Sequence, residues 1–384
     1  MSAEESVELS SNQLGELATR VAEEVTEQSG GPGLESKTPR EAVDKYFETR
    51  DLKPGTQRTQ ESSLYNHFVE WCNEVAGIDD MTTLTGDNLA NYRIWRRDKA
   101  SSRVDKLSPK SEETQQKITR TFIEYCESFS AVHQGLHEYV LVPTLDKEDE
   151  VRKEILDSET AKEILDYLRK YEYASVQHVV MLLFGASGMR ISDLHSLDVG
   201  DHITNSDGPY LKIRHRPEKG TTLKNGKEGE RTVYVSDAVN EVLEDYIENQ
   251  RTDKADEYGR EPLLTSSHGR LSKSTIRNYV YAWTRPCATG KECPYGRDPE
   301  ECRGARRNNW ASQCPDSLSC HPVRKGYITQ ELKSGVPVTI LSQRCDVSES
   351  ILEKHYDLRT DEEKMAARRV AMQLAHEKKP GYAE

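Results

Sequence analysis

The sequence predicts a mainly α-helical protein with a small β-hairpin or sheet, organised as a helical N-terminal domain and a larger C-terminal domain. Apolar residues recur at helical spacing along most of the chain, whereas residues 210–215 and 231–235 alternate apolar and polar side chains, as strands do. The length of 384 residues is enough for two domains and a tail. A charged stretch at 140–157, with a proline near its start, is the expected linker.

Residues 1–37 are expected to form a flexible acidic arm. They are poor in aromatic residues, and positions 29–33 have the Gly-rich composition of a flexible linker. One short amphipathic helix that docks on a partner is the alternative. The polar start lacks a secretory signal, and no apolar run approaches the roughly 20 residues that cross a membrane, so we expect a cytoplasmic protein.

Residues 38–139 are expected to form a bundle of four helices, because apolar residues recur there at spacings of three and four. Basic residues gather around the connection after the third helix. Among them, Arg96 and Arg97 could contact phosphate groups, or the connection could be a solvated basic loop. The expected apolar stripes of the four helices are Val43, Tyr46 and Phe47; Leu64, Phe68, Trp71, Cys72 and Val75; Leu89, Tyr92 and Trp95; and Ile118, Phe122, Tyr125, Cys126 and Phe129.

The chain carries a formal net charge of −13, with 53 Lys and Arg against 66 Asp and Glu. This balance is unusual for a protein that binds nucleic acid, because phosphates are normally met by a basic face. Either the protein binds no nucleic acid, or its acidic residues coat surfaces that face away from it, as in proteins adapted to concentrated salt. At about 1 M salt the Debye length is only about 3 Å, so long-range repulsion would be screened.

The stretch 320–335 is expected to be a helix, with Pro322 in its first turn and a glycine at its end. His321 and Arg324 are three residues apart, so both side chains can project from one end of this helix. Tyr356 follows about thirty residues later. A guanidinium binds phosphate oxygens bidentately, and a phenol can attack phosphorus once its proton is removed. Together the three residue types suggest phosphate chemistry.

A second arginine, Arg190, is expected at a turn between two helices. The apolar segment 176–184 ends in Gly-Ala-Ser-Gly, and a new helix is predicted to start near Met189. The chain therefore contains Gly-x-Arg-Ile-Ser-Asp-Leu, then His-x-x-Arg, then a tyrosine about thirty residues on. Over roughly residues 148–360, this order and spacing resembles the tyrosine recombinase, or phage integrase, family. The wording His-Pro-Val-Arg-Lys-Gly with His-Tyr-Asp most resembles integrase-like members from salt-loving archaea.

The resemblance implies a site-specific DNA recombinase or integrase that breaks and rejoins strands through a 3′-phosphotyrosyl intermediate. It implies double-stranded DNA as the partner, a homo-oligomer that is tetrameric during synapsis, and no cofactor for catalysis. A C-terminal helix would pack on a neighbouring protomer or on its own subunit. The implied parts are a core-binding (SAM-like) domain at 38–139, a linker at 140–157, a tyrosine recombinase catalytic domain at 158–360 and a tail at 361–384.

Four residues then have expected roles in the reaction. Tyr356 would be the nucleophile that attacks phosphorus. His321 would hydrogen-bond the phosphate or assist deprotonation of the tyrosine. Arg190 and Arg324 would hold the phosphate and stabilise the charge on its non-bridging oxygens, a task that other enzymes give to a metal ion.

For two further roles the sequence offers more than one residue. In the resembled family a lysine on the hairpin loop protonates the leaving 5′ oxygen, and the usual spacing falls between Lys224 and Lys227. Lys224 is favoured, and Lys227 is then expected to contact DNA, although either could simply meet phosphate or solvent. The family usually has a second His or Trp shortly before the tyrosine. Here Arg344 or Cys345 falls near that position, and Arg344 could donate the same hydrogen bond.

Two other functions compete with recombination. A relaxing topoisomerase of type IB would use the same chemistry as a monomer, but the small helical domain and short catalytic domain argue against it. A DNA-binding regulator could keep the fold without the activity. The presence of all four expected catalytic side chains argues against that interpretation.

Eight cysteines in a chain expected in the cytoplasm point to a metal or to free thiols rather than disulfides. Five of them fall in the segment 286–320, which has Gly and Pro turns and few apolar residues. A structural Zn²⁺ would tie such a segment together. The spacings are not the CxxC pairs of zinc ribbons, so free thiols in an unliganded loop are the alternative. The expected ligands are Cys287, Cys293, Cys302 and Cys314, with Cys320 as the alternate fourth ligand.

Overall fold

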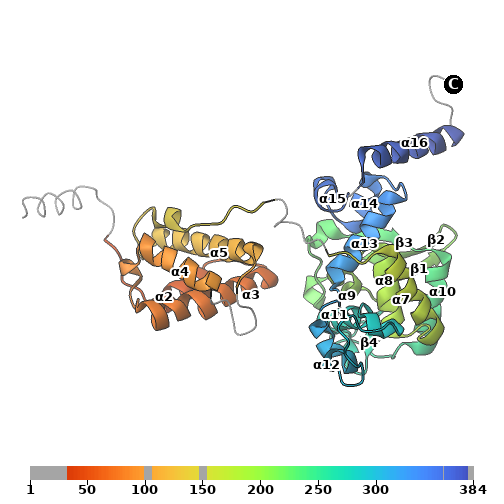
Figure 1. The fold of residues 1–384 in the computed structure, drawn as a ribbon, viewed down its shortest axis with the longest axis horizontal. Helices are drawn as coiled ribbons and strands as arrows, with labels where there is room; N and C mark the ends of the chain where they lie inside the picture. The colour runs from red at the N-terminus through yellow and green to blue at the C-terminus, as the bar shows by residue number, and fades with distance from the viewer. Residues whose placement is uncertain (1–32, 99–105, 147–153, 358, 379–384) are drawn as a thin grey trace, which may run out of the picture. The chain divides into compact units, whose positions relative to one another are not determined.

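The computed structural model describes residues 33–98, 106–146, 154–357 and 359–378 (Figure 1). The chain forms two compact units, Met1–Arg152 and Lys153–Glu384. Most of the expected acidic arm, the middle of the expected linker and the end of the expected tail lie outside the described residues. Among the helices of the described ranges, none combines the length and the apolar character needed to cross a bilayer.

The first unit is a helical bundle around an aromatic core. Thr38 caps the first helix, since its hydroxyl accepts the Glu41 N–H at 3.2 Å while the Glu41 carboxylate accepts the Thr38 N–H at 2.9 Å. Phe68 packs edge-to-face on Tyr92 and Phe122, with ring centroids 5.4 Å apart in each pair. The α-helices are α2 (Pro39–Glu48), α3 (Pro54–Ser63), α4 (Gly86–Asp98) and α5 (Pro109–Ser128).

The second helix of this bundle departs from the prediction at its end. It continues from α3 into two π-helical segments, η1 (Leu64–Val69) and η2 (Cys72–Ala76). A π-helical turn takes one extra residue and so rotates the following side chains around the axis. Cys72 is still buried, but Val75 is 55% exposed, and its predicted place in the core is wrong.

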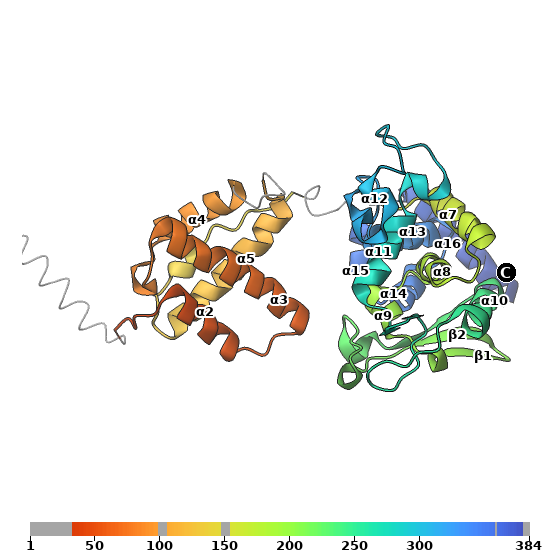
Figure 2. The same ribbon diagram turned by 90° about the horizontal axis from the view of Figure 1, so that it is seen from below.

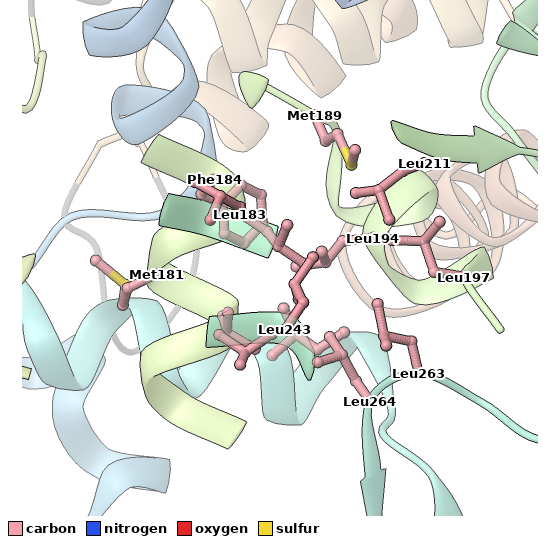
Figure 3. Close-up of a cluster of buried hydrophobic side chains, with 14 of the residues drawn as sticks. Met181, Leu183, Phe184, Met189, Leu194, Leu197, Leu211, Leu243, Leu263 and Leu264 are labelled. Atoms are coloured by element: carbon pink, nitrogen blue, oxygen red, sulfur yellow. The ribbon is translucent and has the colours of Figure 1, made fainter. Parts of the chain in front are cut away.

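Helix α8 (Val176–Ser187) is the central helix of the second unit, and α7, α10, α11 and α13 all pack against it (Figure 2). Its nearly continuous apolar sequence suits a helix that is covered on most sides. Figure 3 shows Leu183 of α8 in one cluster with Leu194 and Leu243 from two neighbouring helices. Burying one such side chain contributes about 1.5–3 kcal/mol. The surrounding helices are α7 (Ser158–Tyr171), α9 (Ile191–Ser196), α10 (Asp237–Asp245), α11 (Lys273–Trp283) and α13 (Cys320–Lys333).

A three-stranded antiparallel sheet contains the predicted hairpin. Strands β2 (Gly208–Ile213) and β3 (Arg231–Tyr234) pair with Ile213 opposite Arg231. A third strand, β1 (His202–Asn205), pairs with the other edge of β2. Strand β1 is not predicted from the sequence, because its four residues are partly buried or exposed and carry no clear alternation. The described residues also contain a short two-stranded ladder of β4 (Thr265–Ser266) and β5 (Gly269–Arg270).

The C-terminal helices form a small core of their own beside the main one. As predicted, α13 begins at Cys320, and its end is followed by Gly335 with a φ of 92°. Its Ile328 and Leu332 pack with Leu341 and Leu352 from the next two helices. The apolar residues of the last helix are about half exposed. These helices are α14 (Val338–Cys345), α15 (Glu349–His355) and α16 (Asp361–Lys378), and the exposed residues are Met365, Val370, Met372 and Leu374.

Close contact between α13 and the chain that enters the second unit gives a stability prediction. A Cβ on Gly326 would lie 2.0 Å from the Leu156 carbonyl oxygen, a backbone atom that cannot simply rotate away. We expect Gly326→Ala to lower the free energy of unfolding by about 1–3 kcal/mol, as overpacking does, despite the better helix propensity of alanine. Urea denaturation of the full chain measures the change.

The matched control is Gly185→Ala in α8. A Cβ there meets only Leu165 Cδ1, at 3.4 Å, which is close to ordinary contact. Alanine should be neutral at this position or stabilise the helix by up to about 1 kcal/mol. Equal unfolding free energies for the two variants would contradict the described packing of α13.

Candidate active site

Arg190 is positioned by a tight turn between α8 and α9. Gly188 ends α8 with a φ of 59°, and a Cβ on it would lie 2.3 Å from the Tyr327 ring, so both its conformation and its surroundings require glycine. The backbone N–H of Arg190 then donates to the Asp193 carboxylate at 3.1 Å, which caps α9. The Arg190 side chain is 16% exposed, so its charge lies in a partly closed site.

Arg324 is buried at the junction of three segments, with 3% of its surface exposed. One of its terminal nitrogens donates to the Gly188 carbonyl, and the other donates to the Cys345 carbonyl at 2.7 Å. Burial lowers the pKa of this guanidinium, and the nearby positive charge of Arg190 acts in the same direction, while Cys345 and Tyr356 act against it. Through these two carbonyls, Arg324 joins the turn that presents Arg190 to the end of α14.

Tyr356 follows α15 and is held in the small C-terminal core, with 5% of its surface exposed. Its N–H donates to the Leu352 carbonyl at 2.9 Å, and its own carbonyl accepts the Thr329 hydroxyl at 3.2 Å. The imidazole of His321 stands at 67° to the Tyr356 ring, with centroids 6.3 Å apart. The structure thus brings His321, Arg324 and Tyr356 together with Arg190.

Asp346 is a site residue that the sequence analysis missed. It ends α14 in the left-handed region, at a φ of 52°, which Asp tolerates better than most residues. Its carboxylate and its carbonyl both accept hydrogen bonds from the Arg190 guanidinium, and the carboxylate also accepts the Asn225 side-chain N–H at 2.9 Å. Asp346 thus takes up Arg190 donors that a phosphate would need, one with its carboxylate and one with its backbone carbonyl.

A second ion pair beneath the site joins the sheet to α9 and α14. Arg231, at the start of β3, donates to the Asp193 carboxylate at 2.7 Å and to the Arg344 carbonyl at 2.7 Å. The side chains of Arg231 and Asp193 are 10% and 1% exposed. The signal for Asp193 was present in the sequence, because an acid three residues after the start of a helix is typical of a cap.

Arg344, the expected substitute for the second His, has other partners in this structure. It donates to the Tyr327 hydroxyl at 2.7 Å and to the carbonyls of Ala186 and Tyr234 at 2.9 Å each. These bonds hold α14 against α8 and β3. Its neighbour Cys345 is fully buried, and burial raises the pKa of its thiol. A direct phosphate contact by Arg344 stays a prediction, and it requires these bonds to open.

The basic residues outside the central cluster differ in their accessibility. Lys224 and Lys227 are both exposed on the loop between β2 and β3, and Lys224 precedes the Asn225 that reaches Asp346. In the first unit Arg96 is only 4% exposed, so its guanidinium is poorly accessible to DNA. Arg97 is more accessible, with 37% of its side chain exposed beside Asp98.

Residues 154–346 match the phage integrase family. The chain belongs to this family. The predicted family resemblance is therefore confirmed, and the match ends ten residues before Tyr356. No protein of curated function shows a detectable match to the chain.

Solved integrase structures share the fold of this phage integrase family member at low sequence identity. The Tn1549 transposon integrase in complex with a circular intermediate DNA has a TM-score of 0.61 and 13% identity, over 89% of this chain and 100% of that one. A lambda integrase tetramer bound to a Holliday junction has a TM-score of 0.57 and 12% identity, over 90% and 82%. A lambda integrase dimer bound to a core site has a TM-score of 0.54 and 13% identity, over 92% and 80%.

The pairing of Asp346 with Arg190 predicts a specific response to oxyanions. We expect Asp346→Asn to lower the unfolding free energy in chloride by about 1–3 kcal/mol, because a charged hydrogen-bond partner is lost. Sulfate should then stabilise the variant more than it stabilises the wild type, because Arg190 is open to an oxyanion. A tenfold excess of sulfate over its Kd would add about 1.4 kcal/mol.

Thermal unfolding in sulfate and in chloride at equal ionic strength measures this difference. Asp253→Asn is the control, because its side chain is 94% exposed and any general salt effect should be the same as in the wild type. An identical sulfate response in Asp346→Asn and the wild type would show that Asp346 does not occupy an oxyanion site.

Proposed function

We propose that the protein is a site-specific DNA recombinase, or integrase, that breaks and rejoins strands through a 3′-phosphotyrosyl intermediate. The observation that carries this proposal is the convergence of Arg190, His321, Arg324 and Tyr356 in the fold of the phage integrase family. A buried phenol beside two guanidinium groups is suited to attack on a phosphodiester, because the positive charges offset the charge that develops on the phosphate.

In the proposed reaction, the Tyr356 oxygen forms a bond to phosphorus while the bond from phosphorus to the 5′ oxygen breaks. The phenol proton passes toward His321, and Lys224 gives a proton to the leaving 5′ oxygen, which becomes a free hydroxyl. Arg190 and Arg324 hold the non-bridging oxygens. Because the phosphotyrosine keeps one ester bond for each bond broken, attack by another 5′ hydroxyl rejoins the strand without ATP.

DNA has to rearrange the site before this reaction can start. Arg190 is engaged by Asp346, and Tyr356 is only 5% exposed. A scissile phosphate at Arg190 must displace or share the Asp346 carboxylate, and the end of α15 must move so that the phenol reaches phosphorus. The described conformation is therefore a resting state in the proposed cycle.

We further propose that double-stranded DNA is held by both units and that the chain assembles into a tetramer on its sites in the cytoplasm. In the first unit, a groove of about 820 Å³ is lined by Arg58 and Lys110 and by several hydroxyl side chains, which suit phosphate oxygens. Arg97 and Lys227 would add surface contacts. Similar integrases have been solved as a dimer and as a tetramer on DNA, which supports this expectation.

One observation favours a second candidate, a DNA-binding regulator without activity. The carboxylate and the carbonyl of Asp346 occupy donors of Arg190, which a permanently inactive protein could tolerate. A relaxing topoisomerase is the third possibility, and it would remove supercoils from a plasmid as a monomer. Formation of a covalent adduct excludes the regulator, and exchange between two sites without free relaxation excludes the topoisomerase.

Tyr356→Phe is expected to abolish the covalent protein–DNA adduct while DNA affinity is kept, because only the nucleophilic oxygen is removed. The wild type and the variant are incubated with duplexes that carry a nicked candidate site, and adducts are separated on a denaturing gel. Tyr327→Phe is the matched control, since it removes another hydroxyl of the same small core, one bonded to Arg344. An adduct formed by Tyr356→Phe would refute this assignment.

Arg190→Ala is expected to slow cleavage by about 10²–10³-fold, the usual cost of losing one donor to a charged transition state. Single-turnover cleavage of the same nicked duplex measures the rate, and a mobility shift measures DNA binding separately. Arg169→Ala is a control on the exposed side of α7. Cleavage at the wild-type rate by Arg190→Ala would mean that this arginine does not stabilise the phosphate.

A further inference from the structure

The cysteine-rich segment before α13 has no part in the proposed reaction. The two ends of this segment are in contact, because the Thr284 hydroxyl accepts the Leu318 N–H at 2.8 Å. Between residues 287 and 314, a range that the structure describes throughout, Ala311 is the only apolar side chain that is buried. The hydrophobic effect therefore contributes little to holding this segment in one conformation.

Two cysteines of this segment are less exposed than the residues around them. Residues 290–303 are all described, and Cys293 and Cys302 are the only two among them that are not exposed. Together with Cys287 and Cys314 they line a single cavity of about 20 Å³. This volume is about that of one small bound species. Within the described ranges no three His, Cys, Asp or Glu side chains already meet in a metal-binding geometry, so the thiols surround the cavity without converging fully.

Each of the four cysteines begins the same kind of turn. The carbonyl of the cysteine accepts the N–H of the residue three positions later, so the same backbone turn follows each of the four residues. The four turn bonds are Gly290 to Cys287 at 3.3 Å, Gly296 to Cys293 at 2.9 Å, Ala305 to Cys302 at 2.9 Å and Ser317 to Cys314 at 3.1 Å.

The charge around the cavity suits a thiolate cluster. Four thiolates on a divalent cation carry a net charge of −2, which needs positive neighbours. Arg285 and Arg297 both line the cavity. The buried Arg285 side chain is fixed there, since it donates to the Ala282 carbonyl at 2.8 Å and to the carbonyls of Gly304 and Ala305.

We propose that Cys287, Cys293, Cys302 and Cys314 bind one Zn²⁺ ion that holds this segment in its fold. Four thiolates are a typical structural zinc set, and they leave no open position for water, so the ion takes no part in phosphate chemistry. The segment leads directly into α13, and the ion therefore also fixes the chain that enters the helix of His321. Cys320 is excluded as a ligand, because it does not line the cavity and packs against the main core instead.

Metal analysis of the full chain purified under reducing conditions tests the proposal. We expect about one zinc per chain, and after removal and replacement by Co²⁺ we expect the visible absorption of a tetrahedral thiolate site. Cys302→Ser should lose most of the bound metal and melt at a lower temperature. Cys320→Ser is the matched control from the same segment, and it should keep one metal per chain.

Each alternative gives a different outcome. Wild-type protein that contains no zinc and takes up neither Zn²⁺ nor Co²⁺ in a titration under reducing conditions overturns the proposal. Equal metal loss in Cys302→Ser and Cys320→Ser also overturns it, because the ligand set would then be different. If Cys302→Ser does not fold, the cobalt spectrum and zinc content of the wild type still decide. None of these measurements depends on DNA cleavage, so the zinc proposal is tested independently of the proposed recombinase activity.

Discussion

The buried guanidinium of Arg324 is the contact on which the rest of the candidate site depends. Moving such a charge out of water costs several kcal/mol unless it is well hydrogen-bonded, and here two carbonyls from segments far apart in the chain accept its N–H groups. One of them belongs to the Gly188 turn that presents Arg190, and the other belongs to Cys345, next to Asp346. The side chain that would bind phosphate thus also holds together the two segments that carry Arg190 and Asp346.

Arg324 is not the only arginine that joins separate elements of the site. Arg231 and Arg344 repeat the arrangement at the base of the site, where each guanidinium joins two or three elements through backbone carbonyls. Carbonyl partners leave the arginine charges uncancelled, so the site keeps a positive potential in a protein whose net charge is −13. The Asp193 and Asp346 carboxylates offset part of that potential while no phosphate is present.

The sequence was most informative where local chemistry alone decides the structure. The period of three and four predicted the helices around Tyr46 and Phe122, and the proline and glycine signals placed α13 correctly. Val75 was misplaced because a π-helical turn has no clear signature in the sequence. Asp346 was missed for a different reason. Its role depends on a left-handed backbone and on a partner 156 residues away, and neither can be inferred from spacing.

The bond between Asn225 and Asp346 has a consequence for when the protein would cut DNA. Asn225 follows Lys224 directly on the hairpin loop, and the carboxylate that it contacts is the one that engages Arg190. An oxyanion that pulls Asp346 away from the arginine also releases the loop beside the lysine. In the proposed reaction, Arg190 and Lys224 would then become available together, so that loosely bound DNA would not be nicked.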